Sequence, residues 1–316
     1  MDSDRGDIPD TPEPKRETVS GRSGWLIVAL VVLAAVDVVV GLVGIALGSI
    51  SNLPTQLVAI FGSAIQVLIP AMILRRQPER RLRRDWLLLG FLVLSVIEVV
   101  ESGASVAINA AFRSPGGAAD AYRWAVALGL AFTLIRSAGA ILVAVGLARS
   151  TRRAGAPRSS TAGMVVGTVL GILAIVDAAM AVRLTGRLGP AALFTGLATS
   201  PVVVTAWAVA AWLAVRAPAG FGPRARTAFA AGATIEVVAS VVGAIVVSIV
   251  YTDTSVASVG LYESLAPVIA LASTLGWGLI LVAADRGLPR PGFADGEPPP
   301  PPPPPPRAED LGAAVD

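Results

Sequence analysis

Long apolar segments separated by short polar ones dominate the chain between residues 25 and 284. Each apolar segment approaches or exceeds the 18 to 20 residues that a helix needs to cross the hydrocarbon core of a bilayer. We therefore predict an all-α integral membrane protein with eight transmembrane helices. They are expected at residues 25–50, 55–74, 86–109, 125–147, 163–182, 191–215, 228–251 and 265–284.

Polar segments flank this apolar region on both sides. Residues 1–24 and 285–316 are rich in charged residues and proline, which predicts disordered tails. Nine consecutive prolines lie between Pro298 and Pro306 and predict a stiff polyproline II rod. The rod is either a spacer or a docking segment for a cytoplasmic protein.

The positive charges indicate how the helices are oriented. With eight spans, 20 of the 25 Lys and Arg residues fall on the side that carries both tails. Positive charge is retained in the cytoplasm, so we predict a cytoplasmic-membrane protein with both termini inside. The arginines between Arg75 and Arg84 favour this orientation, and they also suit anionic lipid headgroups.

Composition excludes several kinds of chemistry. The chain is 54% hydrophobic and 15% charged, and it contains no cysteine and no histidine. Disulfides, Ser-His or Cys-His nucleophiles and ordinary zinc sites are therefore excluded. We expect no enzyme activity, no metal and no cofactor. Basic residues lie between apolar segments and form no face of a soluble domain, so we expect no nucleic-acid binding.

Two short motifs recur at nearly constant spacing. Leu33-Ala-Ala-Val-Asp37 returns as Leu173-Ala-Ile-Val-Asp177, and Ile97-Glu-Val-Val100 returns as Ile235-Glu-Val-Val238. We therefore predict two four-helix units, 25–153 and 161–284. An even number of spans in each unit gives both units the same orientation.

The predicted fourth helix carries an arginine at its centre. Arg136 cannot lose its charge inside a bilayer and needs a partner. Counterparts of Glu101 and Arg136 in the second unit are Ala239 and Ser273, so acid and base are present together and absent together. This co-occurrence predicts an intramembrane ion pair between Glu101 and Arg136.

Other polar side chains follow one face of the third predicted helix. Ser95, Glu98, Ser102, Ser105 and Asn109 are spaced by three or four residues, so this face is expected to line the bundle interior or a cavity.

Four embedded acids are expected to lack basic partners: Asp37, Glu98, Asp177 and Glu236. Two interpretations of them stay open. They form a proton or cation pathway for coupled solute transport, or they are neutral carboxyls that join helices. On the second interpretation, the protein is a membrane scaffold whose tails bind a partner.

Overall fold

A computed structural model describes residues 20–47, 53–78, 80, 85–114, 117–153, 161–188, 201–216, 222–252 and 256–289. These residues form helices and no strand. The helices are α1 (Ser20–Leu47), α2 (Leu53–Arg76), α3 (Trp86–Arg113), α4 (Ala118–Arg153), α5 (Thr161–Leu188), α7 (Pro201–Arg216), α8 (Pro223–Thr252) and α9 (Val256–Arg286).

Seven of the described helices are long and apolar enough to cross a membrane, which is typical of a polytopic membrane protein. The shorter helix is α7, with 16 residues. It begins at Pro201, since proline suits the first turn of a helix, where its missing N–H is not needed. Residues 191–200 of the predicted sixth span lie outside the described residues, so the count of eight spans stays a prediction.

Several helices extend beyond the apolar segments that predicted them. Helix α4 covers 36 residues instead of the expected 23, and α9 begins at Val256 instead of residue 265. Helix α1 begins at Ser20, inside the predicted N-terminal tail, and α9 ends at Arg286, inside the predicted C-terminal tail. Hydropathy detects only the membrane-embedded part, whereas a helix continues into water wherever its backbone bonds are satisfied.

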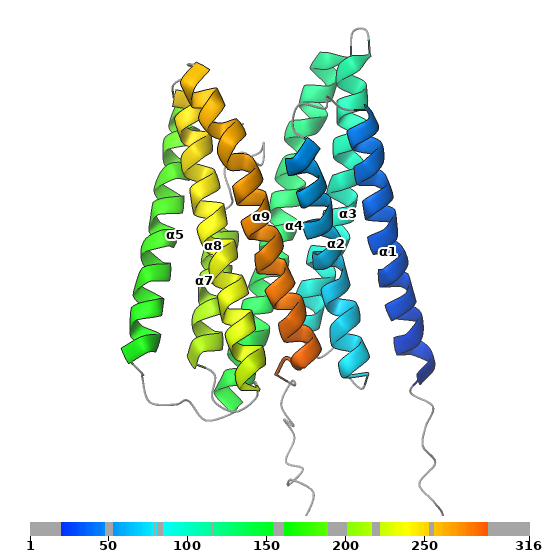
Figure 1. Ribbon diagram of the computed structural model, residues 1–316, viewed down its shortest axis with the longest axis vertical. Helices are drawn as coiled ribbons and strands as arrows, with labels where there is room; N and C mark the ends of the chain where they lie inside the picture. The colour runs from blue at the N-terminus through cyan, green and yellow to red at the C-terminus, as the bar shows by residue number, and fades with distance from the viewer. Residues whose placement is uncertain are drawn as a thin grey trace, which may run out of the picture.

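The helices form two groups, α1 to α4 and α5 with α7 to α9 (Figure 1). We call the end where α1 begins and α9 ends the terminal end, and the opposite one the far end. The groups meet at the terminal end, where α2 contacts α9 and α4 contacts α7, and they spread apart toward the far end (Figure 1).

Helix contacts follow the same scheme in both groups. In the first group, α1 contacts α2 and α3, α2 contacts α3, and α3 contacts α4. In the second, α5 contacts α7 and α8, α7 contacts α8, and α8 contacts α9. If α1, α2, α3 and α4 are matched with α5, α7, α8 and α9, the α2–α9 contact between the groups corresponds to the α7–α4 contact.

Glycine sets the close approach of α3 and α4. A Cβ atom added to Gly90 would lie 2.7 Å from the Val143 backbone nitrogen and 2.8 Å from the Gly139 carbonyl oxygen. Lipid tails are as apolar as the helix surfaces, so membrane helices associate largely through such close backbone packing. The α3–α4 pair therefore depends on a small residue at position 90.

We expect Gly90→Ala to lower the free energy of unfolding by about 1–2 kcal/mol, because backbone atoms of α4 cannot move aside as a flexible side chain would. Gly103 on the same helix is the matched control, since its added Cβ would meet nothing within 4 Å. Gly103→Ala should leave stability unchanged or raise it by up to about 1 kcal/mol. Unfolding in lipid–detergent mixtures would measure both; equal effects would contradict the proposed contact.

Candidate functional site

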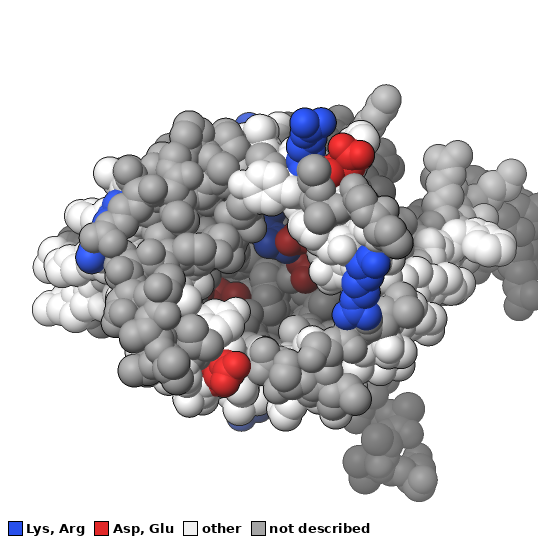
Figure 2. All heavy atoms as spheres, turned by 90° about the horizontal axis from the view of Figure 1, so that it is seen from above, with Lys and Arg blue, Asp and Glu red and all other residues white. Residues whose placement is uncertain are grey.

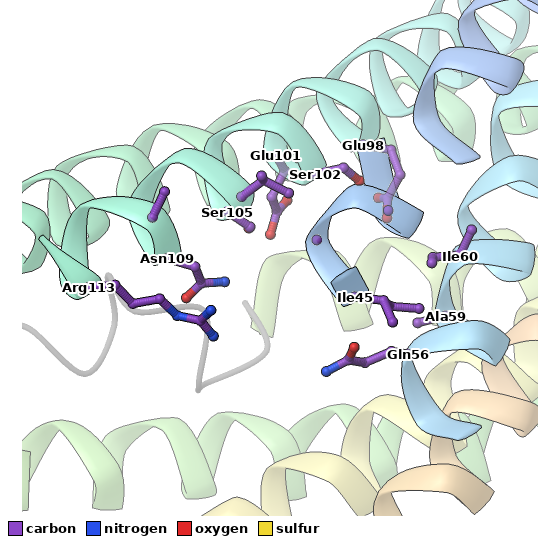
Figure 3. A pocket seen from close by; sticks show the side chains of 14 residues that line it. Ile45, Gln56, Ala59, Ile60, Glu98, Glu101, Ser102, Ser105, Asn109 and Arg113 are labelled. Atoms are coloured by element: carbon purple, nitrogen blue, oxygen red, sulfur yellow. The ribbon is translucent and has the colours of Figure 1, made fainter. Parts of the chain in front are cut away.

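A cavity of about 730 Å³ lies between α3 and the adjoining parts of α1 and α2. We call it the vestibule. Gly41, Gly44 and Ile45 line it from α1, and Gln56, Ala59 and Ile60 line it from α2. Side chains of α3 cover the facing wall, from Glu98 to Arg113 (Figure 3).

The polar face predicted on α3 divides into two parts. Ser102, Ser105 and Asn109 line the vestibule together with Glu98. Ser95, one turn closer to the terminal end, does not: it is fully buried, and its hydroxyl donates to the Phe91 carbonyl at 2.8 Å. The predicted polar stripe is therefore a cavity wall only from Glu98 onward.

Arg136 of α4 lies against the terminal-end portion of the vestibule. Its Nη2 atom donates to Glu101 Oε2 at 2.6 Å and to Glu98 Oε2 at 2.9 Å. Glu98 was expected to lack a basic partner, and that expectation is wrong. The two acids are three residues apart, about one helical turn, so a single guanidinium from the adjacent helix reaches both.

Glu236 of α8 extends this site into the second helix group. Its carboxylate accepts bonds from the Ser273 hydroxyl at 3.0 and 3.1 Å. It also interacts electrostatically with Glu98 and Arg136 across the boundary between the groups. Ser273 was the sequence counterpart of Arg136, and it contacts the acid that corresponds to Glu98.

We call Glu98, Glu101, Arg136 and Glu236 the charged cluster. Glu98 and Glu101 bond the one guanidinium, and Glu236 interacts with it only electrostatically, so the cluster has an excess of acid whenever its members are ionised. Seen from the far end, acidic and basic atoms lie deep inside a hollow at the centre of the molecule (Figure 2). Within the described residues, no group of three or more acidic side chains is placed to hold a metal ion.

An aromatic layer lies on the terminal-end side of the cluster. Phe91 and Phe229, both fully buried, precede Glu98 and Glu236 by seven residues each, about 10 Å along their helices. Trp207 of α7 lies between them, with ring centroids 6.4 and 6.5 Å away, and contacts Trp277 at 5.3 Å. These four packed rings therefore lie about two helical turns nearer the terminal end than Glu98 and Glu236. The recurrence of Phe at 91 and 229 is a sequence signal that pattern reading missed.

Asp37 and Asp177 lie apart from the vestibule wall. Both are almost fully buried, at 2% and 1% exposure. The Ser63 hydroxyl of α2 donates to Asp37 Oδ2, which joins α1 to α2. This geometry matches a helix-joining role for Asp37 more closely than a place along the cavity.

A second group of polar contacts, which sequence reading missed, lies at the terminal end. Arg80 donates to Asp85 Oδ2 at 2.6 Å, and its Nη2 donates to the backbone carbonyls of Leu288 and Pro289. Gln77 Nε2 also donates to the Leu288 carbonyl. We call these contacts, with the Arg76–Asp285 ion pair at 2.9 Å, the latch. The latch joins the end of α2 and the residues that follow it to the last turn of α9 and the chain just after it.

The latch changes the expected role of the arginines between Arg75 and Arg84. Arg80 is buried, which removes it from contact with lipid headgroups, whereas the exposed Arg76 side chain pairs with Asp285. Arg75 is exposed, and residues 81–84 lie outside the described residues. The proline run from Pro298 to Pro306 lies outside them as well.

Comparisons with protein-family models, with curated proteins and with solved structures gave no match for this chain.

Proposed function

We propose that the protein carries a solute across the cytoplasmic membrane by alternating access, coupled to protons or cations at the charged cluster. The observation that carries this proposal is a vestibule that ends at the cluster, with an aromatic layer beneath it. A water-accessible route ending at midmembrane charges is typical of carriers.

The exchangeable pattern of helix contacts supports the proposal. We propose that α1–α4 and α5–α9 are parallel repeats related by an axis along the membrane normal, with the termini on the cytoplasmic side. The charged cluster draws on both repeats, with Glu98, Glu101 and Arg136 from the first and Glu236 from the second. Rocking one repeat against the other would close the far end. The same motion would break the contacts of the latch and of the aromatic layer, so that the charged cluster becomes accessible from the cytoplasm.

The excess of acidic side chains in the cluster favours binding of a positively charged solute or coupling ion. Protons or cations entering the vestibule would be attracted to the carboxylates, and Arg136 would hold two of these carboxylates in place. Among the described residues, we identify no arrangement of side chains suited to catalysis, and we propose a non-enzymatic role.

Single cysteines test alternating access directly, because the chain contains no cysteine of its own. Ser102→Cys should react with a membrane-impermeant thiol reagent from the far-end side and, in the other state, from the cytoplasmic side. Ala210→Cys, at a fully buried core position, should react from neither side. Gln56→Cys, which lines the vestibule from the start of α2, should react only from the far-end side.

Coupling is tested in the same vesicles by varying pH on each side between 5 and 8. If the cluster carries protons, pH should change the ratio of the two Ser102→Cys labelling rates. That dependence should disappear when Glu98→Gln and Glu236→Gln are added. Labelling from the far-end side alone, under every condition, would exclude a carrier and favour a scaffold with structural acids.

A further inference from the structure

A second hollow lies between α5 and α7, away from the vestibule. It is a groove of about 500 Å³ that begins near Arg216, the last residue of α7, and reaches Ala174 on α5. From Met164 to Ala174 it follows α5 for ten residues, about 15 Å. We infer that this groove binds one anionic phospholipid of the leaflet at the terminal end, with an acyl chain in the groove and the phosphate on Arg216.

The groove is shaped for a hydrocarbon chain. Apart from Thr168, Thr205 and Arg216, its lining is apolar or glycine, including Gly167, Gly171, Ala208 and Val209. A Cβ added to Gly171 would meet nothing within 4 Å, so the groove is open at this point. Gly167 has a different role: its missing side chain lets the Trp212 ring lie against α5, where the indole N–H donates to the Gly163 carbonyl at 3.1 Å. Trp212 thereby forms a fixed wall of the groove.

Charge selects the headgroup. Arg216 is the only charged residue that lines the groove within the described part of the chain, and its guanidinium stacks on Trp212 at 4.6 Å. No described carboxylate forms a salt bridge with it. Arginine beside tryptophan at a helix end is suited to the headgroup level, where a phosphate accepts its N–H bonds.

Comparison of the two helix groups explains why this arginine is free to bind a ligand. Helices α2 and α7 both end in arginine, Arg76 and Arg216, at an offset of 140 residues. Arg76 pairs with Asp285 of the facing α9. In the second interface, where α7 faces α4, the counterpart of Asp285 is Ala148, which carries no carboxylate. The chain thus supplies a carboxylate for the arginine that ends α2 and none at the corresponding position for Arg216, and a lipid phosphate in the groove on the α5 side of α7 takes that role.

The inference does not depend on transport, and the full chain in lipid nanodiscs tests it. A fluorophore on Val209→Cys, at the exposed edge of the groove, reports lipids with brominated acyl chains by quenching. Brominated phosphatidylglycerol in a phosphatidylcholine bilayer should bind about fivefold more strongly than brominated phosphatidylcholine, since one Arg near an anionic headgroup contributes about that factor.

Three variants decide the outcome. Arg216→Gln should lower the preference to about one. Arg149→Gln is the matched control, because Arg149 also stacks on a tryptophan, Trp86, at 4.5 Å and does not line the groove; it should keep the fivefold preference. Gly171→Leu should fill the groove and reduce quenching by both lipids. A wild-type preference near one, an equal loss in Arg149→Gln, or full quenching in Gly171→Leu would overturn the inference.

Discussion

Replacing Arg80 with alanine should lower the free energy of unfolding by about 3–5 kcal/mol, the largest effect we expect from one substitution. The Arg80 and Asp85 side chains are each only 2% exposed, so the variant would leave an uncompensated carboxylate in a buried site. The Leu288 and Pro289 carbonyls would lose the Arg80 guanidinium as a donor. Chemical unfolding of the purified protein in lipid–detergent mixtures would measure the loss.

Two further variants distinguish the effect of leaving Asp85 buried and unpaired from the effect of removing a positive charge anywhere in this segment. Arg75→Ala, at an exposed position of the same segment, should change stability by no more than about 0.5 kcal/mol. Adding Asp85→Asn to Arg80→Ala should recover part of the loss, because asparagine still accepts the Leu88 N–H at the start of α3 but carries no charge. A loss below about 1 kcal/mol in Arg80→Ala would show that the buried contacts of Arg80 contribute little to stability.

Removing the arginine of the charged cluster should give the second largest effect. We expect Arg136→Gln to lower the free energy of unfolding by about 2–3 kcal/mol, since Glu98 and Glu101 would then face each other without a cation. The loss is smaller than for Arg80 because the Arg136 and Glu101 side chains are about one-third exposed, which weakens the charge interaction.

A cycle of variants identifies the cause. Adding Glu98→Gln and Glu101→Gln to Arg136→Gln should restore most of the stability, because no unpaired charge remains. Ser273→Ala is the control at the matching position of the second group, where only a hydrogen bond to Glu236 is lost. It should cost less than about 1 kcal/mol. If the triple variant is no more stable than Arg136→Gln, the ion pairs do not account for the effect.

The two interfaces between the helix groups differ in a way that bears on the proposed rocking motion. The α2–α9 interface carries the latch, with a buried arginine and several carbonyl contacts. The α4–α7 interface is bordered by an apolar hollow lined by Ile141, Val145, Pro201 and Val209. Polar contacts are specific to one register, whereas apolar surfaces slide at lower cost, so we propose that the α4–α7 side moves first.

The sequence by itself determined the membrane class, the positions of most helices and the identity of the embedded charges. The length of the apolar segments determines the membrane class and the helix positions, because segments this long and apolar are stable only in a bilayer. The embedded charges follow from a different rule, that an arginine inside a bilayer requires an acidic partner. The recurrence of the Asp37 and Glu98 motifs at 177 and 236 predicted two four-helix units. The contact scheme is the same in both groups, but their relationship as repeats stays a prediction.

Only the tertiary structure decided which acids meet. Helical spacing places Glu98 and Glu101 near one face of α3, but it does not say that a single guanidinium from α4 reaches both. The latch could not be inferred either, because Arg80 and Leu288 are 208 residues apart and their contact depends on how α2 packs against α9. Local pattern determines what each helix can bury, whereas the angle between helices determines which polar groups share a cavity, and that angle depends on packing at positions such as Gly90.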